Sequence, residues 1–181
     1  DGIVVPGLVD LHTHIGEGSN PFAIGTDVLL STGVTTGCSQ GDVGHENIDS
    51  WIWQTRPDAP HARGLLAINL APFGEKAGMS GLELVNSSTV QQTVKAAERH
   101  SDVVRMVSVN LSERSLGRAK AGTMFQYALE LRKRLSLPLM IGLAPEKILP
   151  LRTQLDGLIH GDIVTYCYRS TPWTLFPEGR P

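Results

Sequence analysis

The sequence predicts an α/β fold in which helices cover a parallel sheet. Two observations carry this prediction: short β-like runs alternate strictly with longer helical stretches, and the β-like runs are largely apolar. Apolar strands joined through helices are typical of parallel sheets. The 181 residues contain no linker, low-complexity tract or internal repeat, so we expect a single domain. Six strands fit either an open doubly wound sheet or an incomplete eight-stranded barrel.

The elements follow from apolar periodicity. The predicted strands are Gly7–Ile15, Thr35–Ser39, Gly64–Leu70, Val103–Leu111, Pro138–Leu143 and Asp162–Tyr168. The predicted helices are Pro21–Ser31, Glu46–Gln54, Ser88–His100, Thr123–Leu135 and Glu146–Leu155. The fourth helix shows the period best, with one apolar face formed by Met124, Ala128, Leu131 and Leu135. Ser88 is the expected N-cap of the third helix, and Gly33 is the glycine expected after the first.

Composition excludes several classes of partner. A formal net charge of −2 gives no basic surface for nucleic acid or for an anionic membrane. The longest apolar stretches are strand-sized, so no span of a bilayer is expected, and no secretory signal is visible. Cys38 and Cys167 lie far apart in apolar runs and are expected to be small core residues rather than disulfide partners. These features favour a reducing, cytoplasmic setting.

The strongest chemical signal lies near the start of the chain, in the segment Pro6-Gly7-Leu8-Val9-Asp10-Leu11-His12-Thr13-His14. Alternate side chains of a strand share one face, so Asp10, His12 and His14 are expected to project together. Imidazole nitrogens two residues apart at the end of a strand can bind one ion such as Zn²⁺. Two surface histidines are the plain alternative. The apolar strand and the proline–glycine corner before the pair favour metal ligands.

This segment resembles the first barrel strand of the amidohydrolase superfamily, which includes dihydroorotases, hydantoinases and N-acyl amino-acid deacetylases. Three later segments resemble the same family in order and spacing. They are Gly33-Val34-Thr35-Thr36 before the second strand, Leu137-Pro138-Leu139-Met140-Ile141 at the fifth and Gly161-Asp162-Ile163-Val164-Thr165 at the sixth. The whole most resembles the deacetylase-like amidohydrolases related to dihydroorotase. The resemblance implies a TIM-type (β/α) barrel, with about six of its eight β/α units in residues 1–181 as one partial domain.

The resemblance also implies a reaction, the metal-dependent hydrolysis of an amide, a cyclic amide or an acyl ester in a small-molecule substrate. In such a site one or two divalent ions, usually zinc, lower the pKa of bound water and polarise the carbonyl, while an aspartate moves protons. His12 and His14 would be metal ligands. A six-stranded barrel would leave its first and last strands without neighbours. We therefore expect homo-oligomerisation, or stabilisation by a complementing chain or by further segments.

Three positions depart from the family's ligand set. The family's carboxylated lysine on the fourth strand would fall in Val104–Ser112, which has no lysine, and Ser108 lies near the expected place. Gly142 stands where the fifth-strand histidine would follow Ile141, and Tyr166 stands where the sixth-strand histidine would follow Thr165. The family's catalytic aspartate would lie beyond Pro181. The metal site in this chain is therefore expected to be incomplete, because catalytic zinc usually has three protein ligands.

Other polar residues could replace the missing ligands. Asp42, His45 and Glu46 follow the second strand, at the end where barrel active sites form, so Asp42 and His45 are possible additional site residues. The alternative that the segment favours is a plain polar loop. The remaining histidines are poor candidates, because they precede a strand or close a helix: His61, His100 and His160.

Two alternative functions remain open. Gly37-Cys38-Ser39-Gln40-Gly41 matches the G-x-S-x-G pattern in which Ser39 would be the nucleophile of a serine hydrolase. That hypothesis requires a helix directly after the serine, and Gly41 and Gly44 oppose one. The other alternative is a catalytically degenerate or truncated homologue with a scaffold or binding role, which the missing ligands favour.

Overall fold

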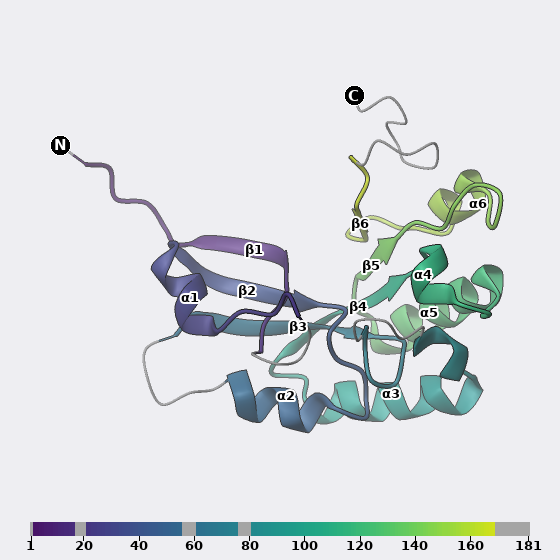
Figure 1. The fold of residues 1–181 in the computed structure, drawn as a ribbon, viewed down its shortest axis with the longest axis horizontal. Coiled ribbons are helices and arrows are strands. Elements are labelled where there is room, and N and C mark those ends of the chain that lie inside the picture. The colour runs from purple at the N-terminus through teal and green to yellow at the C-terminus, as the bar shows by residue number, and fades with distance from the viewer. Residues whose placement is uncertain (1, 17–20, 56–60, 76–80, 169–181) are drawn as a thin grey trace.

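The computed structural model describes residues 2–16, 21–55, 61–75 and 81–168. In this part of the chain six parallel strands form one sheet in sequential order. They are β1 (Leu8–Thr13), β2 (Val34–Gln40), β3 (Arg63–Asn69), β4 (Val104–Asn110), β5 (Leu139–Gly142) and β6 (Ile163–Thr165). Each of these strands overlaps a predicted one, so the strand predictions are confirmed. The sheet curves from β1 to β6 into a nearly closed barrel (Figure 1).

The helices also occur where the sequence predicts them, with shifted ends. They are α1 (Thr26–Ser31), α2 (Ile48–Thr55), α3 (Ser87–Arg99), α5 (Ala121–Leu135) and α6 (Leu151–Asp156). Two short elements were not predicted, the 3₁₀ turn η1 (Gly81–Leu84) and the single-turn helix α4 (Glu113–Leu116). Helix α6 begins five residues later than the predicted Glu146–Leu155, because Pro150 disfavours a helical conformation in the residue before it and lacks a backbone N–H. Gly33 follows α1 with a φ of 85°, as predicted.

The N-cap of α3 differs from the prediction. Asn86, not Ser88, accepts hydrogen bonds from the backbone N–H groups of Ser88 and Thr89, at 2.9 and 3.2 Å. The Thr89 hydroxyl in turn accepts from the Asn86 N–H at 3.1 Å, which completes a reciprocal capping box. The prediction of Ser88 was wrong because both polar residues precede the apolar helical pattern and pattern alone does not choose between them.

We expect Asn86→Ala to lower the free energy of unfolding by about 1 kcal/mol, since two N–H groups of the first helical turn lose their acceptor. Ser88→Ala is the matched control, because its side chain is exposed and accepts neither bond. We expect it to change stability by a few tenths of a kcal/mol at most. Urea denaturation of the two variants checks this. An equal loss in both would mean that Asn86 is not the cap.

The core has an outer and an inner layer. Outside the sheet, apolar residues of the strands pack against α1, α2, α3 and α5; Leu66 and Ile68 of β3 have no exposed surface. The inner cluster consists of strand residues alone, Cys38, Ala67, Met106 and Met140, which places it on the concave face of the sheet. Burial raises the pKa of the Cys38 thiol to about 12, so this cysteine is an inert core residue, as predicted.

The six strands all end at the same edge of the sheet, which we call the carboxyl edge. At this edge the two outermost strands meet across the inside of the barrel, where His12 Nδ1 of β1 lies 2.6 Å from Thr165 Oγ1 of β6. The predicted sixth strand was too long, because Tyr166 has a φ of 62° and ends the extended conformation. In the described ranges, no helix has the length and apolar character needed to cross a bilayer.

Candidate functional site

The carboxyl edge gathers polar side chains from five strands and the loops that follow them. Side chains along a strand point alternately to the inside and the outside of the barrel. His12 and His14, two residues apart at the end of β1, therefore both point to the inside. Their rings lie edge to face with centroids 5.8 Å apart. The sequence prediction that the two histidines share one face agrees with this arrangement. Asp10, on the same face, accepts a hydrogen bond from the His12 backbone N–H at 3.0 Å.

His14 is held by a buried carboxylate. Its Nδ1 lies 2.8 Å from Oδ1 of Asp42, whose side chain is completely buried, while Oδ2 of Asp42 accepts a hydrogen bond from the Ser39 hydroxyl at 2.5 Å. The hydrogen bond to Asp42 is the main cause that raises the pKa of His14; partial burial opposes it, and the negative charges of Asp42 and Glu75 add to it. Asp42 therefore orients the His14 ring and stabilises its protonated form.

His12 is held from the opposite side of the barrel. Thr165 Oγ1 contacts its Nδ1 at 2.6 Å, and the Tyr166 hydroxyl lies 3.4 Å from its Nε2. The rings of Tyr166 and His12 are 5.1 Å apart and nearly perpendicular. Tyr166 adopts its left-handed backbone conformation here, which is uncommon for a bulky residue and found mainly where the surroundings enforce it. Tyr166, the residue that the resemblance places where the family has its sixth-strand ligand, therefore packs directly on His12.

A second carboxyl group, that of the half-buried Glu75, lies at the ends of β2 and β4. Its Oε2 accepts a hydrogen bond from Asn110 Nδ2 at 3.1 Å, and its backbone N–H donates to the Gly41 carbonyl. Among the described residues, no hydrogen-bond partner is found for its buried Oε1 or for the buried amide nitrogen of Gln40, a residue that is 1% exposed. Burial is the main cause that raises the pKa of Glu75, while Asn110 and the positive charge of His14 lower it.

Asp42 and His45, the possible additional site residues, have different surroundings. Asp42 contacts His14 directly. His45 instead points toward the outer helical layer, where its Nδ1 lies 3.2 Å from the Thr93 hydroxyl of α3 and its Nε2 lies 3.3 Å from Glu46. Burial lowers the pKa of His45, and Glu46 partly opposes this. The structure therefore brings one of the two residues to the histidine pair and keeps the other away.

The hypothesis of a serine nucleophile is wrong. Ser39 is completely buried, and its hydroxyl donates to Asp42 rather than to a histidine. It also accepts a hydrogen bond from the Ile15 backbone N–H at 3.1 Å. The next helix, α2, begins only at Ile48, whereas a nucleophile elbow needs a helix directly after the serine. Ser39 is a positioning residue for Asp42.

The donor set does not fit a tightly held zinc ion. Ser108 is completely buried and donates to the Ala67 carbonyl at 3.1 Å. A Cβ on Gly142 would lie 2.8 Å from Oδ1 of Asn110, so Asn110 fills the space that a fifth-strand histidine would need. Across the described ranges, no three His, Cys, Asp or Glu side chains are grouped as metal ligands. His12 and His14 alone fall short of the three protein ligands typical of catalytic zinc.

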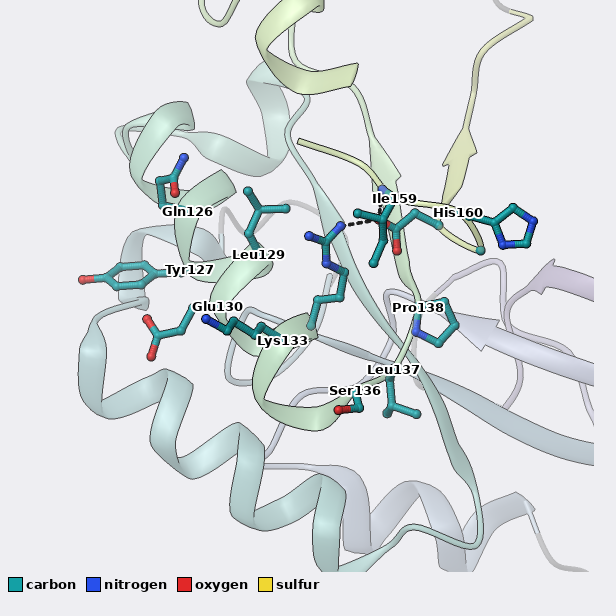
Figure 2. Close-up of a pocket in the computed structure, with 13 residues that line it drawn as sticks. Gln126, Tyr127, Leu129, Glu130, Lys133, Ser136, Leu137, Pro138, Ile159 and His160 are labelled. Atoms are coloured by element: carbon teal, nitrogen blue, oxygen red, sulfur yellow. Dashed lines mark hydrogen bonds and ion pairs between the residues drawn. The ribbon is translucent and has the colours of Figure 1, made fainter. Parts of the chain in front are cut away.

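A separate hollow of about 940 Å³ lies at the opposite end of the sheet, between α5 and the segments that precede β5 and β6 (Figure 2). Its floor contains an ion pair between Arg132 and Asp162, both largely buried. Arg132 also donates to the Gly157 carbonyl at 3.1 Å, so its guanidinium interacts with groups of the protein itself. Active sites of parallel barrels form at the carboxyl ends of the strands, and this hollow lies at the amino ends. It is not part of the candidate site.

Comparisons with known proteins support the fold. No protein-family model and no curated protein matches the chain. Among solved structures, a dihydroorotase matches with a TM-score of 0.79 and 21% identity, over 95% of this chain and 46% of that chain. An adenine deaminase matches with a TM-score of 0.69 and 24% identity, over 90% of this chain and 44% of that chain. The chain thus spans less than half the length of these proteins.

At this level of identity the likeness shows the fold alone, an incomplete (β/α) barrel like the matching parts of the dihydroorotase and the adenine deaminase. The predicted resemblance is therefore confirmed as a likeness of fold, and the alternative of an open doubly wound sheet is wrong. Asn69 also belongs to this edge, since its side-chain amide donates to the Gly41 carbonyl at 3.2 Å. Four residues of the site were not singled out from the sequence: Gln40, Asn69, Glu75 and Asn110. Gln40, Asn69 and Asn110 are the polar last residues of their strands, β2, β3 and β4, which is a signal the sequence does contain.

Proposed function

We propose that this chain is the barrel portion of an amidohydrolase-type protein whose own metal site is degenerate. The ancestral reaction would be the metal-dependent hydrolysis of an amide, a cyclic amide or an acyl ester in a small molecule. In this chain the carboxyl edge keeps the histidine pair and has lost the other ligands. It would bind a divalent ion weakly and catalyse little or no turnover.

One observation carries the proposal: the Tyr166 hydroxyl lies 3.4 Å from His12 Nε2. Nε2 is the nitrogen left for an ion when Nδ1 is engaged elsewhere, as it is here with Thr165. A phenol is a poorer ligand for zinc than the imidazole expected at this position, and it occupies the space beside His12 Nε2. The Asn110 side chain beside Gly142 has the same effect on the neighbouring strand.

The His14–Asp42 pair supports descent from a metal site. A histidine that binds a metal through one ring nitrogen commonly donates from the other to a carboxylate, which fixes its orientation. Asp42 makes this contact with His14 at 2.8 Å from a fully buried position. The His14–Asp42 pair therefore keeps one imidazole oriented for a metal ion although further ligands are missing. For this reason we expect weak metal binding rather than none.

We expect purified protein to retain sub-stoichiometric zinc that dialysis against a chelator removes, and the double variant His12→Ala/His14→Ala to retain less. Elemental analysis of both proteins measures this. We also expect no chelator-sensitive hydrolysis of N-acyl amino acids or a cyclic amide. Equal metal content in the two proteins would remove the basis for the site.

Clear metal-dependent turnover that His14→Ala abolishes would show the degenerate interpretation to be wrong. Asp42 would then be the first replacement ligand to test, by the Asp42→Asn variant. His45→Gln is the matched control, since His45 contacts Thr93 and lies away from the histidine pair.

A further inference from the structure

Two buried polar atoms at the carboxyl edge have no hydrogen-bond partner among the described residues. They are the side-chain nitrogen of Gln40 and Oε1 of Glu75. Gln40 is only 1% exposed, so bulk water does not supply the acceptor that its N–H groups need. A buried donor or acceptor that stays unpaired lowers stability, and native structures contain few of them. Each one therefore calls for a reason, and binding of a ligand is one such reason.

The two unpaired atoms lie close to Gly41. Gln40 directly precedes Gly41 as the last residue of β2, and its side chain shares the inward face of the strand with Cys38. The Glu75 backbone N–H donates to the Gly41 carbonyl, and a Cβ on Gly41 would lie 3.5 Å from Glu75 Oε1. One unpaired donor and one unpaired acceptor thus belong to the same small region of the carboxyl edge.

The chemistry of the acceptor favours a cationic partner. Oε2 of Glu75 accepts from Asn110 Nδ2 at 3.1 Å, so Oε1 is the oxygen left for a ligand. The charge of His14 lowers the pKa of Glu75 and that of Asp42 raises it, so these two charges oppose one another at the Glu75 carboxyl group. Burial is the main cause that raises this pKa. A cationic N–H group would supply a counter-charge and a charge-assisted hydrogen bond, whereas an anion would be repelled.

We propose that Gln40 and Glu75 form a subsite for a small molecule that carries a primary ammonium group beside a carbonyl oxygen, such as an amino-acid amide. The ammonium group donates to Glu75 Oε1, and the carbonyl oxygen accepts from the side-chain N–H of Gln40. Glu75 as a whole is half-buried, so the ligand enters from the solvent side of this residue. The proposal rests on the proposed function, because it assigns a binding role to the carboxyl edge of a protein with little or no turnover.

Binding of glycinamide, measured by NMR in the presence of a chelator, tests the subsite. The readouts are the shifts of the Gln40 side-chain amide and the Gly41 backbone amide, which we expect to saturate in the millimolar range. Acetamide lacks the ammonium group and ethylammonium lacks the carbonyl group. We expect each to bind at least about tenfold more weakly than glycinamide, because each leaves one of the two protein groups unpaired. Equal affinity for either compound overturns the proposal.

Two variants each remove one of the protein groups. Glu75→Gln keeps an acceptor for Asn110 and removes the charge, and Gln40→Leu removes the unpaired donor. Both should lower the affinity for glycinamide at least about tenfold. Glu46→Gln is the control, since it removes the same charge from a residue that follows β2 and pairs with His45. We expect it to leave the affinity unchanged.

A direct hydrogen bond between Gln40 and Glu75 is the other explanation of the two atoms. In that case glycinamide would cause no saturable shift and Gln40→Leu would destabilise the fold, which overturns the proposal. Unchanged glycinamide affinity in folded Glu75→Gln also overturns it. The chelator separates this test from that of the proposed function. Metal-dependent turnover would contradict the proposed function alone, and loss of glycinamide binding would contradict the subsite alone.

Discussion

Replacing Asp162 with alanine is expected to lower the free energy of unfolding by about 3–5 kcal/mol. The Asp162 side chain is 1% exposed and lies directly before β6. It pairs with the Arg132 guanidinium of α5 and accepts backbone hydrogen bonds from Leu139 at 2.8 Å and Ile159 at 2.9 Å. Its loss would leave the 13% exposed Arg132 without its counter-charge and the buried Leu139 N–H without an acceptor.

The matched control is Asp156→Ala, which removes an aspartate whose side chain is 62% exposed and which pairs with Arg152 on the surface of α6. We expect a loss of no more than about 0.5 kcal/mol there, because water screens an exposed pair. Urea denaturation of both variants measures the difference. Equal losses would mean that the Asp162 cluster does not hold α5, β5 and β6 together.

Replacing Asp42 with alanine is expected to cost about 2–3 kcal/mol, since the Ser39 hydroxyl and the His14 ring both lose their buried acceptor. Asp42→Asn keeps an acceptor and removes the charge, so it isolates the effect of the ion pair. Asp49→Ala, at a 71% exposed position that pairs with His100, is the control and should cost about 0.5 kcal/mol or less.

The Asp42→Asn variant should also change the dependence of stability on pH. Asp42 raises the pKa of His14 above 6.5 in the folded protein. The pair's contribution is therefore complete below pH 6.5 and is lost as the pH rises through the folded pKa of His14. Asp42→Asn should cost more stability at pH 6 than at pH 9. A cost that does not depend on pH would show that His14 is not protonated against Asp42.

The fold could be predicted from the sequence because strand and helix periods are local properties. Every strand and every long helix has a matching pattern, including the buried face of α5 formed by Met124, Ala128 and Leu131. The choice between a barrel and an open sheet could not be made from pattern. That choice depends on the curvature of the sheet. The curvature shows in the contact between His12 and Thr165, which lie 153 positions apart in the sequence.

The candidate site could be predicted only in part. The pattern at His12 and His14 predicts that the two rings lie together, as they do. The order of the segments predicts three departures from the ligand set of the family that the sequence resembles. The contacts made at this edge depend on spatial packing: Tyr166 packs on His12, the Asn110 side chain lies against Gly142, and the Glu75 backbone N–H donates to the Gly41 carbonyl. His45 is the opposite case. Its position after β2 in the sequence suits a metal ligand, but the loop directs its side chain toward α3.

The central claim is that Tyr166 occupies the place of a metal ligand beside His12. Zinc titration calorimetry of Tyr166→His tests it most directly, with Tyr166→Phe as the control that removes the hydroxyl and adds no ligand. Histidine tolerates the left-handed conformation of this position better than most residues. With a third imidazole we expect zinc affinity to rise at least about tenfold over the unmodified chain, or about 1.4 kcal/mol, and Tyr166→Phe to show no such gain. Equal affinity in Tyr166→His and Tyr166→Phe, with both proteins folded, would contradict the account.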